Sequence, residues 1–170
     1  MAFTYSKLAE VSVGATAVST IDFNNIPQNY TDLILKVSAR GSVVRGSGGY
    51  YYQVTVNGLT TNQTTRYINS NGTSATSGNF ARLFGYMNDS GTTVNTFGSD
   101  DWYFPNYSGN SFKSVSLDSI NENNGTLSDM NILAGLWSNS AAINQLIITP
   151  NGGNFVQYST ATLYGVKAEV

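Results

Sequence analysis

Strand-like alternation of apolar and polar residues runs through the whole chain, and it constrains the fold more than any other feature. In the clearest example, residues 32–40, one face carries Leu33, Leu35, Val37 and Ala39. No window of helical size carries apolar residues at i, i+3, i+4 and i+7 behind a capping residue. The sequence therefore predicts an all-β chain.

Turn signals divide the chain into short strands. We expect strands over residues 8–13, 17–23, 32–40, 50–56, 80–87, 94–97, 101–104, 112–120, 130–137, 143–149 and 158–166. We expect roughly eight to ten of these segments to be strands of one sandwich, and strands at this spacing predict a two-sheet antiparallel sandwich, jelly-roll-like. Residues 59–79 are too polar to fill a core and are expected to form a long loop, with a short strand near 66–68. One domain spans residues 1–170, with an N-terminal arm of about residues 1–7.

Composition excludes most catalytic chemistry. The 170 residues include no cysteine and no histidine. A disulfide, a histidine-based triad and the common zinc sites are therefore impossible within one chain. We expect no enzyme activity, no cofactor and no metal site.

Charge and the lack of long apolar segments argue against two classes of partner. The net charge is -2 and only 11% of the residues are charged, so no positive field is available to attract a nucleic-acid backbone. No segment approaches the eighteen or so apolar residues of a membrane span, and the N-terminus lacks an apolar run of signal length. We expect no nucleic-acid or membrane partner, and folding in the cytoplasm.

The glycine-rich stretch from Arg40 to Gly58 is not a nucleotide site, because a strand rather than a helix follows its glycines. Two interpretations of Arg40 and Arg45 remain open: a solvated loop, or contacts with a neighbouring acidic subunit. Tyr50 and Tyr51 point to opposite faces, so one of them must be exposed or covered by another chain.

Four carboxylates, Asp100, Asp101, Asp118 and Glu122, are the densest acidic group. A glycosidase pair or a calcium site would need such residues. The adjacent Asp100 and Asp101 would point to opposite faces of a strand, however, so we interpret the group as solvated turn carboxylates. An enzyme acting on glycan through Asp101 and Asp118 is a minor alternative.

The aromatic residues Trp102, Phe104, Tyr107 and Trp137 could stack on sugars or fill the core. Trp102 and Phe104 share strand parity, and a sandwich needs large inward-facing residues, so core packing is favoured. In the alternative interpretation, Trp102, Tyr103 and Tyr107 stack on a glycan.

Three stretches, "IDFNNIPQNYTDLILKVSAR", "DWYFPNYSGNSFKSVSLDSINENN" and "LAGLWSNSAAINQLIITPNGGNFVQYSTATLYGV", carry a resemblance. In this order they resemble segments of a family of small structural proteins of tailed bacteriophages. The resemblance spans residues 8–166 and implies a virion component of β-sandwich type, assembled in the cytoplasm of a host bacterium. Residues 59–79 follow no pattern of that family.

This resemblance and the missing catalytic groups predict a capsid decoration (cement) protein. We expect a homo-oligomer, a trimer, that binds the major capsid protein and stabilises the head. The alternative is a module of a tail fibre or spike that binds host-surface glycan. The residues expected to contact the capsid or another subunit are Phe3, Tyr5, Lys7, Arg40, Arg45, Tyr50 and Tyr51.

Overall fold

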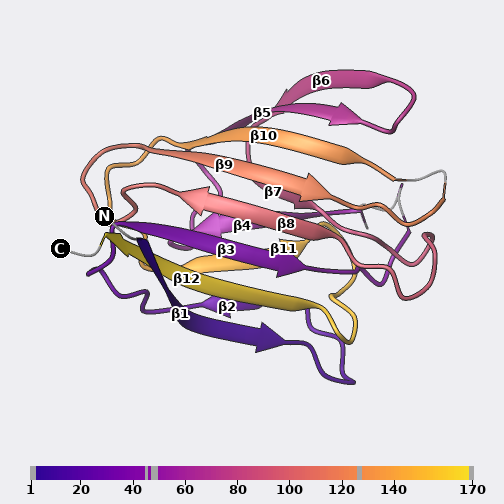
Figure 1. Ribbon diagram of the computed structural model, residues 1–170, viewed down its shortest axis with the longest axis horizontal. Coiled ribbons are helices and arrows are strands. Elements are labelled where there is room, and N and C mark those ends of the chain that lie inside the picture. The colour runs from indigo at the N-terminus through magenta and orange to yellow at the C-terminus, as the bar shows by residue number, and fades with distance from the viewer. Residues whose placement is uncertain (1–2, 45, 47–49, 126–127, 169–170) are drawn as a thin grey trace.

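The computed structural model describes residues 3–44, 46, 50–125 and 128–168, which form two facing antiparallel sheets (Figure 1). The expected all-β sandwich is confirmed. The eight-stranded large sheet has the order β1-β12-β3-β8-β9-β10-β5-β6, and the four-stranded small sheet has the order β2-β11-β4-β7. The strands are β1 (Phe3–Ser12), β2 (Ile21–Phe23), β3 (Asp32–Ser38), β4 (Tyr51–Val56), β5 (Gln63–Ser70), β6 (Ala75–Phe80), β7 (Leu83–Tyr86), β8 (Ser99–Phe104), β9 (Lys113–Ile120), β10 (Met130–Trp137), β11 (Leu146–Pro150) and β12 (Thr160–Ala168). Among the described residues, no helix has the length and apolarity needed to cross a membrane.

Strand pairing follows the jelly-roll scheme. β1 pairs with β12, β2 with β11, β3 with β8 and β4 with β7, and successive pairs alternate between the two sheets. The pairs are joined within each sheet by β12–β3 and by β11–β4. This order is that of a long antiparallel hairpin rolled across a sandwich, so the expected jelly-roll topology is confirmed.

Two hairpins, β5–β6 and β9–β10, are added to the jelly roll. Both join the large sheet beyond β8 and are called the extension below (Figure 1). The expectation of a long loop over residues 59–79 is wrong, because β5 pairs along its whole length with β10. Threonine, serine and asparagine are tolerated there because one face of each strand is open to water. The expected strand over 94–97 is also wrong, since this segment forms a turn.

The N-terminal segment is a strand rather than an arm. Residues 3–7 pair with β12, from Phe3 opposite Ala168 to Lys7 opposite Tyr164, so the expected arm is wrong for these residues. A register shift follows Lys7, and Lys7 forms an ion pair with Glu10 at 2.8 Å. A bulge and charged side chains protect this edge of the sheet from further pairing.

The core lies between the inner faces of the two sheets. Alternation along β9 is strict, with every second residue from Lys113 to Ser119 buried. Trp102, Phe104, Tyr107 and Trp137 are all buried, which confirms that these aromatic residues pack in the core.

One cation is buried at the rim of this core. The side chain of Lys113 is 1% exposed, and its Nζ donates hydrogen bonds to the carbonyl oxygens of Gly109 (2.5 Å), Ser111 (2.6 Å) and Ala141 (2.8 Å). It also lies 5.9 Å from the centre of the Trp137 ring. Burial lowers the pKa of Lys113. The ammonium group ties two loops together, one before β9 and one after β10.

We therefore expect Lys113→Met to destabilise the fold by about 2 kcal/mol, because the carbonyl groups of both loops lose their shared donor. Urea unfolding monitored by tryptophan fluorescence measures the change. The matched control is Lys36→Met, which removes an exposed lysine and should cost less than about 1 kcal/mol. Equal losses in the two variants would contradict the role given to Lys113.

Candidate functional site

The outer face of the large sheet, which points away from the small sheet, is built of rows that cross the strands. Antiparallel register places every second residue of one strand beside every second residue of the next. One row crosses all eight strands in the order Lys7, Tyr164, Ile34, Tyr103, Ser116, Ala134, Arg66, Asn79. Two hollows lie along this row.

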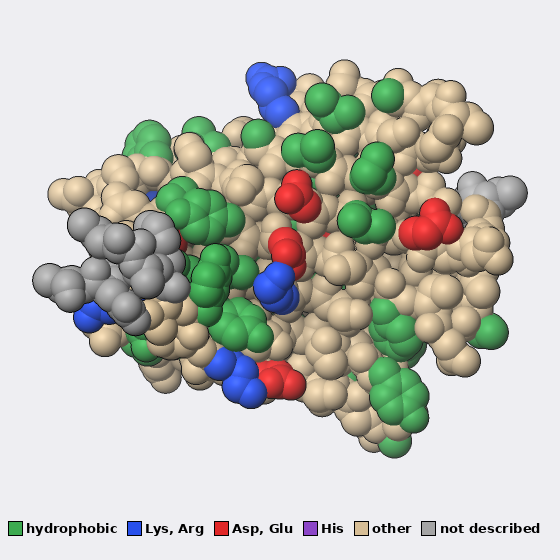
Figure 2. Space-filling view, in the orientation of Figure 1, with side chains coloured by type: hydrophobic (Ala, Val, Ile, Leu, Met, Phe, Trp, Pro, Cys, Tyr) green, Lys and Arg blue, Asp and Glu red, His purple; other side chains and the backbone are tan. Residues whose placement is uncertain are grey.

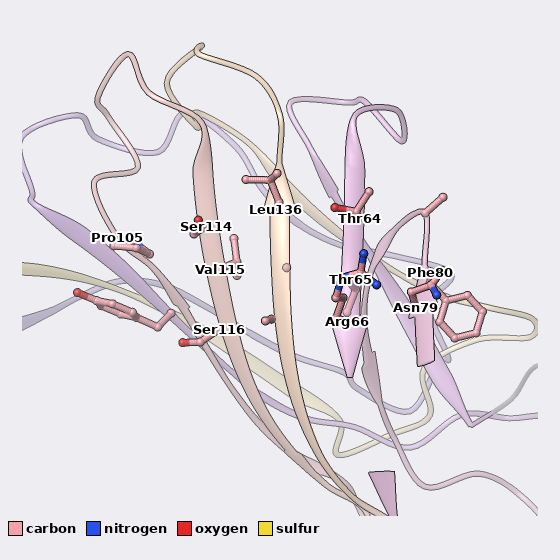
Figure 3. A pocket seen from close by; sticks show the side chains of 14 residues that line it. Thr64, Thr65, Arg66, Asn79, Phe80, Pro105, Ser114, Val115, Ser116 and Leu136 are labelled. Carbon is pink, nitrogen blue, oxygen red and sulfur yellow. The ribbon is translucent and has the colours of Figure 1, made fainter. Parts of the chain in front are cut away.

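The first, the extension hollow, has a volume of about 650 Å³ and lies over the added strands (Figure 3). Small side chains of Ser114, Ser116 and Ala134 form its floor. Larger residues border it, with Pro105 on one side and Phe80 on the other (Figure 3). The hollow exists because the central strands carry small outward-facing residues between bulky ones.

An apolar patch adjoins the extension hollow. Ile68, Ile120, Met130 and Ile132 are 59%, 46%, 60% and 63% exposed. The register places Ile68 opposite Ile132 and Ile120 opposite Met130. Figure 2 shows hydrophobic side chains gathered over this part of β5, β9 and β10. Clustered apolar residues at this exposure are typical of a contact surface.

The second, the tyrosine hollow, has a volume of about 720 Å³ and lies over β1, β12, β3, β8 and β9. The tyrosines that line it are Tyr5, Tyr103 and Tyr164, and its charged lining is Asp32, Lys36, Asp101 and Asp118. Tyr103 and Ser116 line both hollows, so the two are continuous.

The ring of Tyr103 is held in place by its hydroxyl group. Tyr103 Oη donates to Asp32 Oδ2 at 2.7 Å, and the other oxygen of Asp32 accepts from the backbone nitrogen of Asn106 at 2.8 Å. Burial raises the pKa of Tyr103 to about 12, and the Asp32 carboxylate adds to the rise. The hydroxyl therefore stays protonated and the ring keeps one orientation.

A second fixed pair lies in the same hollow. Lys36 Nζ donates to both oxygens of Asp101 at 2.7 and 2.8 Å. Asp118 lies directly opposite Asp101 in the register, and its side chain forms no hydrogen bond or ion pair with any described residue. The structure thus brings Asp101 and Asp118 together on one exposed face.

The residues expected to make contacts do not share one surface. Tyr5 and Lys7 are exposed on β1, while Tyr50 and Tyr51 are half-buried against ring neighbours in β7. The backbone of Phe3 lies in β1, and its side chain is outside the described part of the chain, as is Arg45.

Arg40 belongs to a buried network instead of a surface. Its side chain is 8% exposed, and its guanidinium donates to the carbonyl oxygens of Thr92 (3.1 Å), Thr93 (2.8 Å) and Thr96 (3.0 Å). Burial lowers the pKa of Arg40, and the Asp89 carboxylate opposes this shift. Both interpretations of Arg40, as a solvated residue and as a subunit contact, are corrected: it organises the turn that was expected to be a strand.

Of the three residues considered for glycan stacking, only Tyr103 is accessible. Trp102 is buried and its Nε1 donates to Tyr52 Oη at 2.8 Å. Tyr107 is buried and its hydroxyl donates to the carbonyl oxygen of Pro27. The accessible rings of Tyr5 and Tyr164 were not considered for stacking. The sequence alternation shows which face of its own strand each tyrosine occupies. It does not show that these faces are the same one until the order of the strands in the sheet is known.

Asp100 corrects the interpretation of the carboxylates as solvated. Asp100 faces inward and is buried, whereas its neighbour Asp101 is exposed, which confirms their opposite orientation. Tyr52 Oη donates a hydrogen bond to Asp100. Burial raises the pKa of Asp100 from 3.8 to about 8, and the hydroxyl groups of Ser119 and Tyr52 only partly oppose it.

This shift predicts a pH-dependent stability. Because the folded state binds the Asp100 proton more tightly than the unfolded state, stability falls as the pH rises from about 4 to about 8 and then levels off. Relative to the natural chain, Asp100→Asn should gain up to about 1.4 kcal/mol per pH unit across this window. Urea titrations at several pH values test the slope. Asp101→Asn, which leaves the buried pair intact, should show no such gain.

No group of three or more His, Cys, Asp or Glu side chains within the described ranges could hold a metal ion. No protein-family model, curated protein or solved structure matches the chain. Function must therefore be argued from the outer face of the large sheet.

Proposed function

We propose that the chain is a structural protein of a tailed-phage virion that decorates the capsid, with the extension as its docking surface. The observation that carries this proposal is the apolar patch of Ile68, Ile120, Met130 and Ile132 beside the extension hollow. The resemblance of the sequence to small virion proteins supports it, and so does the lack of histidine and cysteine.

The extension has the properties of a protein-binding surface. Its four strands lie outside the eight paired strands of the jelly roll. Their outer face combines exposed aliphatic side chains with a hollow bordered by Pro105 and Leu136. Apolar residues at the centre of a patch with polar residues around it are typical of protein interfaces. The partner that docks on this surface is the outer face of the major capsid protein.

Docking through this patch predicts that Ile68→Ser with Ile132→Ser lowers affinity for capsids lacking the protein at least about tenfold, because burial of two aliphatic side chains is lost. Both residues are exposed, so the thermal midpoint should change little. Co-sedimentation with purified capsids measures binding. Val94→Ser removes an aliphatic residue outside the patch that is even more exposed, and it is the control.

Quantitative mass spectrometry of purified particles tests the position on the virion. A decoration protein should be present in on the order of hundreds of copies, since its many weak contacts act together. About a dozen copies would favour the tail-appendage alternative, and absence from the particle would refute both.

Self-association is part of the same proposal. The six residues of β6, at the other edge of the large sheet, include no charged residue and no proline, and such edges are prone to pair. A trimer needs a heterologous contact, in which β6 meets a different surface of the next copy, whereas β6 paired with β6 closes a dimer.

Sedimentation velocity should show a trimer for the natural chain and a monomer for Ser77→Lys, because a charge on the edge opposes strand pairing. Ser12→Lys on the already protected β1 edge is the control and should not change the assembly. A dimer, or a monomer at all concentrations, would overturn the trimer.

A further inference from the structure

We propose that the tyrosine hollow binds a neutral oligosaccharide, with Tyr5, Tyr103 and Tyr164 stacking on sugar rings and Asp101, Asp118 and Lys36 binding sugar hydroxyl groups. This site lies mostly over the jelly-roll strands and reaches β9 of the extension, where Asp118 lies opposite Ile132 of the apolar patch. Sugar binding is a second function, and it does not depend on where the protein lies on a virion.

The aromatic residues are spaced for an extended ligand. Tyr164 and Tyr103 lie on either side of Ile34 in one row of the sheet. Two inter-strand spacings separate their backbones by about 10 Å. Tyr5, on the edge strand, is 60% exposed, and Tyr103 is 38% exposed. Rings in such a row offer apolar faces to successive units of a chain that crosses the strands.

The polar residues suit hydroxyl groups, which both donate and accept hydrogen bonds. Asp101 is fixed by Lys36, whose ammonium group keeps donor capacity for a ligand. Asp118 has unused acceptor oxygens directly opposite. Ser116 lies next to Tyr103 in the row and adds a hydroxyl group. Because these groups project from paired strands, little ordering entropy is lost on binding.

Charge decides between classes of ligand. The hollow holds three carboxylates, Asp32, Asp101 and Asp118, against one ammonium group, Lys36. A net negative lining repels phosphate, sulfate and uronate groups. Lys36 already neutralises Asp101, and Asp32 is occupied by Tyr103 and Asn106. These pairings leave one carboxylate available, which fits a neutral ligand better than a polycation.

The hollow also has room for more than one sugar unit. It crosses five strands and continues into the extension hollow past Tyr103 and Ser116. A cleft that is open along its length accepts an internal segment of a chain, whereas a closed pocket selects a chain end.

Calorimetric titration of the full chain with neutral hexasaccharides of glucose, mannose and galactose tests the inference. We expect at least one to bind with a dissociation constant below about 1 mM. Tyr5→Ala and Asp118→Asn should each weaken binding about tenfold or more. Tyr158→Ala, which removes an exposed tyrosine outside the hollow, should bind as the natural chain does. Thermal melting checks that every variant is folded.

Three results would overturn the inference. They are no binding of any neutral hexasaccharide, binding that Tyr5→Ala and Asp118→Asn leave unchanged, and tighter binding of a heparin or chitosan hexasaccharide than of any neutral one. Loss of capsid binding in the Ile68 and Ile132 variant, with sugar binding retained, would show that the two surfaces act separately.

Discussion

The structure depends on how an eight-stranded sheet is covered by a four-stranded one. The jelly-roll strands of the large sheet face the small sheet, whereas the inner face of the extension is covered mainly by β7. Gly135 has no side chain, which gives Leu83 of β7 room to approach. Gln63 bonds to the carbonyl oxygen of Val54 at 3.2 Å and accepts from the backbone nitrogen of Leu83 at 3.2 Å. Side chains of the extension thus make the contacts with the small sheet that further strands of that sheet would otherwise make.

The inner face of the large sheet also carries a row of polar side chains. In register across one end of the large sheet lie Asp100, Ser119, Asn131 and Asn69. Asn69 Nδ2 donates to Asn131 Oδ1 at 2.6 Å, and Ser119 Oγ accepts from the backbone nitrogen of Tyr86 at 3.1 Å. The bond from Tyr86 of β7 to Ser119 connects this row to the small sheet, so the row helps to fix how β7 sits on the large sheet.

Local alternation predicted one hairpin of the extension well and the other poorly. β9 alternates strictly between buried and exposed residues, and β9 and β10 were expected within one residue of their true bounds. β5 and β6 are rich in Thr, Ser and Asn, so their pairing depends on β10, a neighbour distant in sequence. Burial of Arg40 and Asp100 depends on tertiary contacts, and no local pattern of one sequence contains them. Predicting the tyrosine hollow requires the order of the strands in the sheet as well as the alternation of side chains along each strand.

The same alternation links the core to the outer face. Residues that line the two hollows sit between core residues on the same strands: Trp102 lies between Asp101 and Tyr103, and Val115 between Ser114 and Ser116. The backbone of the outer face is therefore fixed by the packing beneath it. A surface positioned in this way binds without a prior folding step, whereas a loop of the same composition would lose conformational entropy on binding. Both proposed surfaces use this property, and the extension widens the face enough for them to lie side by side.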